Sequence, residues 1–332
     1  MCAKTASKRR RWSLWAVFVT LSLLVAACGG QGGQGSRSGS PPNEEKGEEL
    51  AGMIRIDGSS TVAPLSETAA DLFQQEHPNV QVVVGTTGTG GGFEKFCRNE
   101  TDVSDASRPI KDSEKQACQG SGVAYEEVVV ALDGLANVVS PQADWVNCLT
   151  VQELERIWAP DSQVNNWSLV RPGFPDVPIS LFGAGTDSGT FDYYTEAILG
   201  EEGRIRTDYN ATEDDNVTVQ GVQGSRGALG FLGLSYVEQN RDAMKALAVD
   251  SGNGCVEPSR ETVQNGTYKP LSRPLFIYPS REALQRREVS EFIKFYLDQE
   301  REIAEAALFV PLTDQQLRES REKVERLASG QR

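Results

Sequence analysis

Histidine is almost absent from this chain, whose 332 residues contain only His77, directly before Pro78. Zinc sites built on histidine, Ser-His-Asp triads and histidine acid-base chemistry all need histidines that the chain lacks. We interpret His77 as a surface residue at a helix end. Basic residues are also scarce, since 33 Lys and Arg face 47 Asp and Glu, a formal net charge of −14. Nucleic-acid and anionic-membrane binders need surplus Lys and Arg, so this balance argues against both.

No apolar run is long enough to cross a bilayer comfortably. The best candidate, residues 12–27 (WSLWAVFVTLSLLVAA), is short and follows five basic residues, which is the pattern of a signal peptide over residues 1–27. The run ends in Ala26-Ala27-Cys28 and resembles a bacterial lipobox, in which cleavage leaves the cysteine to be acylated. We expect export and a lipid anchor on Cys28 at the outer face of the bacterial cytoplasmic membrane, or in the periplasm. A plain secretory signal with an incidental cysteine is the alternative.

The segment after the cleavage site contains few residues that can build a core. Residues 28–50 are rich in Gly, Ser, Pro and charge, which predicts a flexible tether. Cleavage would remove five basic and no acidic residues, leaving 28 basic against 47 acidic residues and a net charge of −19. The folded part is expected to begin near Met53.

Four cysteines remain beyond the signal peptide and Cys28, and an even number in an oxidising compartment indicates disulfides. Three pairings are possible. We favour Cys97 with Cys118, which closes a short loop, and Cys148 with Cys255, which joins distant segments of one lobe. A metal site is the rival interpretation, but the chain has no C-x-x-C spacing and no histidine nearby.

Short β-rich runs alternate with helical patterns from residue 53 onward, as in 53–56, 64–76 and 80–84. This order predicts an α/β protein of two lobes, each with a mixed, mostly parallel sheet flanked by helices. In such folds ligands bind where strands end and helices begin. Further strands are expected at 128–132, 135–139, 179–182 and 228–233, and helices near 150–158 and 190–199. The tail predicts two helices, one with its apolar stripe at 289–297 and one opened by a capping box of Thr313 and Gln316.

Two Gly/Ser/Thr clusters follow predicted strands near the start of the folded part. Residues 57–61 (DGSST) precede a helix whose free N–H groups could face an anion, although an ordinary helix cap would look the same. Residues 86–92 (TTGTGGG) include three consecutive glycines that let backbone approach a ligand closely, and a flexible loop is the alternative. No G-x-x-x-x-G-K-[ST] P-loop motif occurs, and the dinucleotide spacing G-x-G-x-x-G that starts at Gly88 fails because Phe93 stands at the last glycine position.

Two further clusters add charge and a third set of donors. Residues 102–110 (DVSDASRPI) bring Asp105 close to Arg108, whose forked guanidinium suits a tetrahedral oxyanion. Asp105 is either a salt-bridge partner of Arg108 or an acceptor for the hydroxyl of a protonated anion. Residues 183–190 (GAGTDSGT) follow a strand and place Ser188, Gly189 and Thr190 as donors at a helix N-terminus. This cluster is not a nucleophile elbow, since Thr186 replaces the required glycine and no histidine base exists.

The four turns together predict a cage of mostly uncharged donors for one small oxyanion, because local dipoles can hold an anion despite a negative overall field. A phosphoryl-transfer enzyme with Ser188 or Thr61 as nucleophile is the alternative. No histidine, neighbouring lysine or two-metal carboxylate cluster would activate either hydroxyl, so we expect no catalysis, cofactor or metal.

At these residues the sequence resembles the phosphate-binding lipoproteins of bacterial Pst-type ABC importers, within the periplasmic-binding-protein superfamily (type II). The likeness covers roughly residues 53–312. Its carriers occur in a specific order: IDGSSTVAPL (56–65), TGTGGGFEKF (87–96), DVSDASRPI (102–110), LTVQELERIW (149–158), GTDSGTFDYY (185–194) and GALGF (227–231).

The resemblance implies two lobes joined by a two-strand hinge that close on one inorganic phosphate. Lobe one would comprise residues 51–131 plus 271–332, and lobe two residues 132–270. An ABC permease in the membrane would receive the phosphate from a monomeric binding protein. Site residues carried over from the family are Ser60, Thr61, Thr89, Asp105, Arg108, Ser188, Gly189 and Thr190.

Asp105 matches a carboxylate of the family, whereas the position of the arginine is a departure from it. Asp105 would accept the proton of hydrogen phosphate and so disfavour fully ionised sulfate. Some members carry the ligand arginine shortly before the S-G-T motif, where this chain has Ala184 and Gly185. We assign the role of that ligand arginine to Arg108. The alternative is that Arg108 does not touch the anion and instead supports Asp105 from behind the ligands. Molybdate, tungstate or sulfate binding, and a phosphate-sensing or adhesive surface protein without transport, remain open.

Overall fold

A computed structural model describes residues 49–186 and 188–330. The expected signal peptide, Cys28 and nearly all of the tether lie outside these residues. The described strands are β1 (Gly52–Gly58), β2 (Val80–Gly85), β3 (Val103–Ala106), β4 (Val128–Val139), β5 (Cys148–Thr150), β6 (Ser180–Ala184), β7 (Asn210–Thr212), β8 (Ala228–Gly233), β9 (Lys245–Asp250), β10 (Cys255–Val256) and β11 (Ser272–Pro279). The helices are α1 (Ala63–Glu76), α2 (Gly88–Phe96), α3 (Asp112–Gly120), α4 (Val151–Trp158), α5 (Gly189–Leu199), α6 (Asp215–Gly224), α7 (Leu234–Gln239), α8 (Arg260–Gln264), α9 (Arg287–Asp298), α10 (Glu300–Ala306) and α11 (Asp314–Ser329), with short 3₁₀ turns η1 (Trp167–Leu169) and η2 (Ala283–Gln285).

The main sheet path runs in the order β2-β1-β3-β11-β4-β8-β6-β7, and β9 pairs with β4, β5 and β10. β1 is parallel to β2 and β3, and β6 is parallel to β7 and β8, whereas β4 and β11 are antiparallel to their neighbours. Each lobe therefore has a mixed sheet, as the sequence predicted. We call the β1–β3 side with α1–α3 and α9–α11 lobe one, and the β6–β8 side lobe two.

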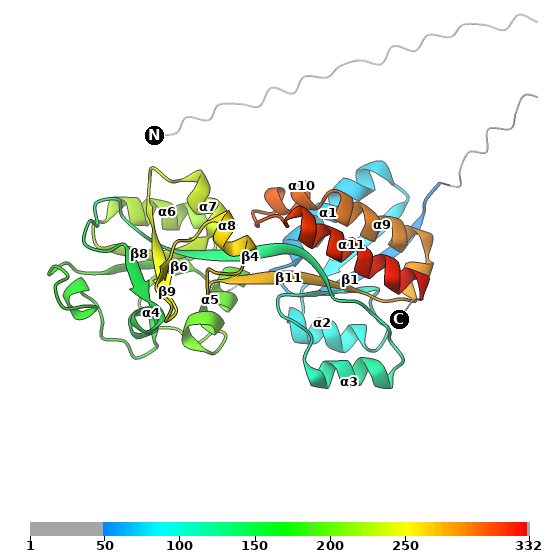
Figure 1. The fold of residues 1–332 in the computed structure, drawn as a ribbon, viewed down its shortest axis with the longest axis horizontal. Coiled ribbons are helices and arrows are strands. Elements are labelled where there is room, and N and C mark those ends of the chain that lie inside the picture. The colour runs from blue at the N-terminus through cyan, green and yellow to red at the C-terminus, as the bar shows by residue number, and fades with distance from the viewer. Residues whose placement is uncertain (1–48, 187, 331–332) are drawn as a thin grey trace, which may run out of the picture. The chain divides into compact units, whose positions relative to one another are not determined.

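β4 and β11 connect the two lobes and run side by side (Figure 1). β4 pairs with β11 from Val128 to Gly134 and with β8 from Leu135 to Val139. The sequence predicted two strands here, and the structure corrects this to one continuous strand. In the sequence, Asp133 and Gly134 look like a break between two strands. In the structure Asp133 pairs with Arg273 of the neighbouring strand β11. Gly134 lies in a tight contact, where a Cβ would be 2.8 Å from Val263 Cγ2.

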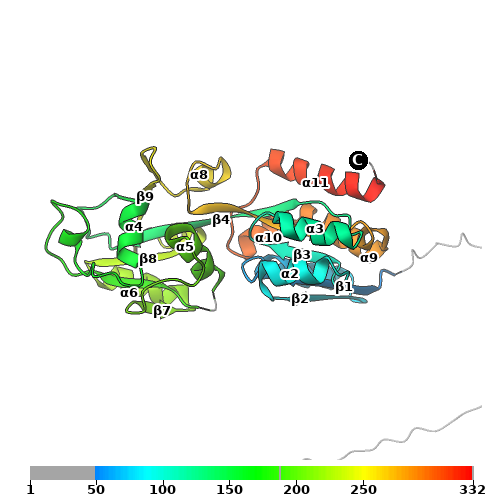
Figure 2. The ribbon, with the colours of Figure 1, turned by 90° about the horizontal axis from the view of Figure 1, so that it is seen from below.

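Each lobe has its own hydrophobic core. Ile54, Phe73 and Phe292 are buried in lobe one, between the sheet and helices α1 and α9. Lobe two is built around Trp158, with Phe231 5.1 Å away and stacked on Tyr194 at 3.9 Å between ring centroids. Figure 2 shows α11, the last helix, beside β4 in lobe one, where the Ser320 hydroxyl donates to the Val129 carbonyl.

Local sequence signals account for several helix ends. Thr313 and Gln316 form the predicted capping box at the start of α11, and Ser188 caps α5 by accepting from the Thr190 N–H at 3.2 Å. His77 lies at the C-terminal cap of α1, as predicted. α10 was not predicted from the sequence. None of the described helices is long and apolar enough to cross a membrane.

Both predicted disulfides are present. Cys97–Cys118 joins the end of α2 to α3, and Cys148–Cys255 joins β5 to β10 across a sequence separation of 107 residues. The first bond therefore fixes two helices of lobe one, and the second closes a long loop within lobe two.

Candidate anion-binding site

The first turn, Ser59 to Thr61, is held by a close backbone approach between β1 and β3. The Ser59 N–H donates to the Asp105 carbonyl at 3.0 Å, and Gly58 has φ +149°. A Cβ on Gly58 would lie 2.1 Å from the Asp105 carbonyl oxygen, so only glycine fits. The turn is thereby placed at the N-terminus of α1, where Ser60 and Thr61 face the space between the lobes.

Asp57 fastens the second turn to the first. Its Oδ1 accepts from the Thr87 N–H at 3.1 Å and the Thr87 hydroxyl at 2.6 Å, and its Oδ2 accepts from Lys95 Nζ at 2.5 Å. Burial alone would raise the pKa of Asp57, but the hydrogen bonds from Lys95 and Thr87 outweigh it and keep the pKa below the ordinary aspartate value. The carboxylate is therefore a stable ionic anchor at neutral pH.

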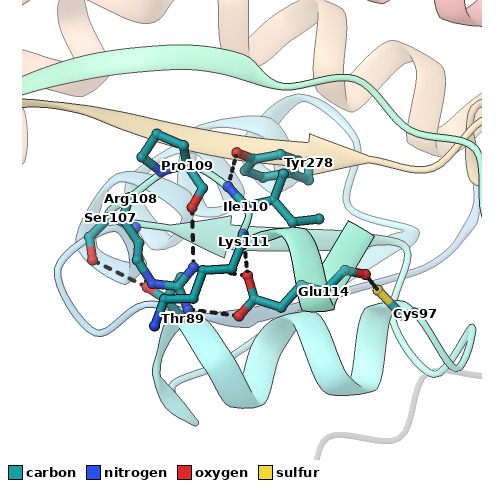
Figure 3. Close-up of polar contacts among 9 residues, drawn as sticks. All are labelled: Thr89, Cys97, Ser107, Arg108, Pro109, Ile110, Lys111, Glu114 and Tyr278. Carbon is teal, nitrogen blue, oxygen red and sulfur yellow. Dashed lines mark hydrogen bonds and ion pairs between the residues drawn. The ribbon is translucent and has the colours of Figure 1, made fainter. Parts of the chain in front are cut away.

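Thr89 at the start of α2 contacts the turn after β3. Its hydroxyl oxygen accepts from the Ser107 N–H at 3.2 Å and lies 3.2 Å from the Ser107 hydroxyl (Figure 3). The two side chains therefore present neighbouring hydroxyls to the same space.

Arg108 forms a two-pronged ion pair with Glu114 of α3, with Nη1 to Oε2 at 2.9 Å and Nη2 to Oε1 at 2.7 Å (Figure 3). Burial would raise the pKa of Glu114, but Arg108 and the Lys111 N–H lower it below its ordinary value. The Cζ atom of Arg108 also lies 5.8 Å from the centroid of the Phe93 ring. The interpretation of Asp105 as the salt-bridge partner of Arg108 is wrong, because among the described residues Arg108 pairs with Glu114 and the Asp105 carboxyl accepts from Ser66.

Asp105 is fully buried behind the cavity wall and is not among the residues that line the cavity. Its Oδ1 accepts from the Ser66 hydroxyl at 3.0 Å, and its Oδ2 has no hydrogen-bond partner among the described residues. Burial, with a smaller contribution from Asp57, raises its pKa to about 8 despite the Ser66 hydrogen bond. The position of Asp105 therefore does not support a direct contact between its carboxyl and a ligand.

The fourth turn meets the first at the N-terminus of α5. A Cβ on Gly189 would lie 2.3 Å from Thr61 Oγ1, so the two turns are in direct contact. The Ser188 side chain is used to cap the helix at Thr190. Ser188, Gly189 and Thr190 are thus next to the cavity without being part of its lining.

These turns surround a cavity of about 330 Å³, at the small end of ligand sites. Four predicted residues line it, namely Ser60, Thr61, Thr89 and Arg108. The lining also includes residues that were not predicted from the sequence: Ser59, Gly88, Gly90, Ser107, Lys111, Asp192, Glu196, Glu202 and Arg273.

The lining residues that were not predicted differ in whether the sequence carries a local signal for them. Ser107 belongs to a motif already singled out, and Lys111 follows it immediately. Arg273 is far from every motif in the sequence. Asp192 and Glu196 lie one helical turn apart on α5, where exposed acidic residues are commonplace. Burial and the nearby Glu202 raise the pKa of Asp192 to about 6, although Arg273 opposes this.

Comparisons with known proteins agree with this geometry. A family model described as "PBP superfamily domain" matches residues 35–300. Protein SphX of Synechococcus elongatus is 46% identical over 82% of this chain and 80% of its own length. The phosphate-binding protein PstS of Staphylococcus saprophyticus is 37% identical over 95% of both chains. The crystal structure of a possible phosphate binding protein from Planctomyces limnophilus matches with 44% identity and a TM-score of 0.79, covering 84% of this chain and 99% of that one.

Two α/β lobes joined by paired strands, with a cavity between turns at strand ends, define a solute-binding-protein fold, and the chain belongs to the PBP superfamily. Within that superfamily it is of the PstS type.

Proposed function

We propose that this protein captures inorganic phosphate between its two lobes and delivers it, without catalysis, to the permease of an ABC importer. The observation that carries the proposal is the cavity, in which hydroxyls from three separate turns meet Arg108 and Arg273. Relatives named as phosphate-binding proteins support the choice of ligand.

Ser60, Thr61 and Thr89 are the proposed hydroxyl donors and Arg108 the proposed cation. Ser188, Gly189 and Thr190 would donate from the α5 N-terminus, which the Gly189–Thr61 contact brings to the cavity edge. Neutral donors and a few oriented cations suit an anion that is bound by shape and hydrogen bonding.

The proposal also includes the location and the mode of action. Export by the signal peptide and acylation of Cys28 would hold a monomeric protein at the outer face of the cytoplasmic membrane. Lobe closure about β4 and β11, with lobe boundaries at 131/132 and 270/271, would let a permease distinguish loaded from empty protein.

Calorimetric titration of the purified, anion-stripped protein with phosphate, sulfate and molybdate tests the proposal. We expect one-to-one phosphate binding at micromolar or lower Kd, with no heat from sulfate. Thr89→Val should weaken phosphate binding about tenfold or more, because a hydrogen bond to a charged group contributes about 1.5–3 kcal/mol.

Thr68→Val is the matched control, because Thr68 lies on α1 with its hydroxyl bonded to the Pro64 carbonyl and makes no contact with the cavity. A folded protein that prefers sulfate or molybdate would overturn the ligand assignment, and one that binds no anion would overturn the proposed function.

A further inference from the structure

Arg273 lies at the point where the chain passes between the lobes. It is on β11, directly opposite Asp133 of β4 in the antiparallel ladder, and its Nε is 3.4 Å from Asp133 Oδ2. The Arg273 side chain is only 12% exposed, and the remaining exposed part faces the cavity. A cation is therefore built into the paired strands themselves.

The same guanidinium contacts both lobes. Its Nη2 donates to Thr61 Oγ1 at 3.3 Å in lobe one, and its Cζ lies 3.7 Å from the Tyr193 ring centroid on α5 of lobe two. The Tyr193 hydroxyl donates to the Pro270 carbonyl at 2.7 Å, which fixes the ring beside β11. The contact with Tyr193 crosses from lobe one to lobe two, so it depends on how the lobes are placed.

Arg273 also has donors left for a ligand. A guanidinium carries five N–H groups, and among the described residues its hydrogen bonds use only Nε and Nη2. Thr61, which shares Nη2, is itself a proposed phosphate donor. Arg108, by contrast, directs both of its terminal nitrogens at Glu114.

We propose that Arg273 binds the captured anion from the hinge and couples its binding to lobe closure. This assignment rests on the proposed function and deepens it. The anion would be held by Arg273 together with the Thr61 hydroxyl, while Tyr193 of lobe two packs against the same guanidinium, so that the bound anion is tied to both lobes through one side chain. The Asp133 carboxylate holds the Arg273 guanidinium beside β4 and offsets its positive charge. The reduced local charge keeps the empty site from retaining other anions.

The test compares Arg273→Lys and Arg273→Gln with the wild-type protein by phosphate calorimetry and by small-angle X-ray scattering with and without phosphate. We expect Arg273→Gln to lose at least 100-fold in phosphate affinity. Arg273→Lys keeps the charge but cannot reach Asp133, Thr61 and the Tyr193 ring together, so we expect at least a tenfold loss and a smaller decrease in radius of gyration on phosphate addition.

Arg226→Gln is the matched control, because Arg226 also stacks on an aromatic ring (Trp145, 5.1 Å) and lies 3.7 Å from an aspartate (Asp144), but outside the cavity. It should leave both measurements unchanged. If Arg273→Gln fails to fold because Asp133 is left unpaired, Asp133→Asn/Arg273→Gln removes both charges and should fold without binding phosphate.

The outcomes separate the two proposals. Wild-type protein that binds phosphate while Arg273→Gln, or the double variant, binds it equally well would overturn the Arg273 assignment alone. Weakened binding with an unchanged compaction in Arg273→Lys would overturn the coupling to closure. Wild-type protein that binds no oxyanion would overturn the proposed function and this assignment together.

Discussion

Gly189 of α5 and Thr61 of the β1–α1 turn are in such close contact that no side chain fits between them. A Cβ at position 189 would lie 2.3 Å from Thr61 Oγ1 and 2.8 Å from Thr61 Cα. Position 189 therefore requires glycine because there is no space for a side chain. Its backbone angles are not the reason, since it is the first residue of a helix and has no unusual backbone angle.

Gly189→Ala should consequently weaken phosphate binding about fivefold or more, because overpacking costs about 1–3 kcal/mol and here opposes the approach of the two turns. Calorimetry measures the effect. Gly224→Ala, at the end of α6, is the control because an added Cβ there meets nothing within 4 Å. Wild-type affinity in Gly189→Ala would show that the turns bind the anion without touching.

Arg108→Lys should lower phosphate affinity about tenfold, because lysine keeps the charge but cannot form the two-pronged pair with Glu114 that orients the guanidinium. The control is Arg98→Lys, since Arg98 pairs with Glu94 and Glu100 at the surface. Equal phosphate titrations of wild type and Arg108→Lys would mean that Arg108 supports lobe one without contributing to binding.

Asp105→Asn should change how stability depends on pH. The folded-state pKa of Asp105 is raised to about 8, so the wild-type protein loses stability as the pH rises from the ordinary carboxyl range near 4 to about 8. The slope is at most about 1.4 kcal/mol per pH unit. Denaturant unfolding should therefore find the variant similar to wild type at pH 4 and more stable at pH 8.5. Asp112→Asn, at a 90% exposed side chain, should show no such divergence.

The same Asp105→Asn variant tests the proton-acceptor role expected from the sequence. That role requires a large loss of phosphate affinity together with a gain of sulfate binding. Because Asp105 lies behind the cavity wall, we expect phosphate affinity to change less than threefold. A reversal of selectivity would restore the original assignment and require the anion to reach deeper than the lining residues.

The two disulfides should have separable effects. Removing Cys148–Cys255 should cost more stability, about 4–5 kcal/mol against about 3 kcal/mol for Cys97–Cys118, because it closes the longer loop. Only the Cys97→Ser/Cys118→Ser variant should also weaken phosphate binding, because that bond joins the helix of Thr89 to the helix of Glu114. Denaturant melts and calorimetry on both double variants check this, and equal affinities would contradict it.

Local signals in the sequence were sufficient for the hydroxyl-bearing turns and for the Thr313–Gln316 cap, since each depends on residues only a few positions apart. Arg273 reaches Thr61 across a sequence separation of 212 residues, and no local pattern encodes that contact. Glu114 was missed for a different reason. A helix-opening glutamate is common, and only the fold shows that its carboxylate faces Arg108 rather than solvent.

β11 lies between β3 and β4 in the sheet, although it comes more than 130 residues after β4 begins. Lobe one is thus assembled from both ends of the folded chain, whereas lobe two is made of the continuous stretch between β4 and β11. During synthesis, lobe two has all of its strands before β11 emerges. The sheet of lobe one lacks its central strand β11 until residue 279 has been synthesised. Lobe one therefore begins first along the chain but is completed last.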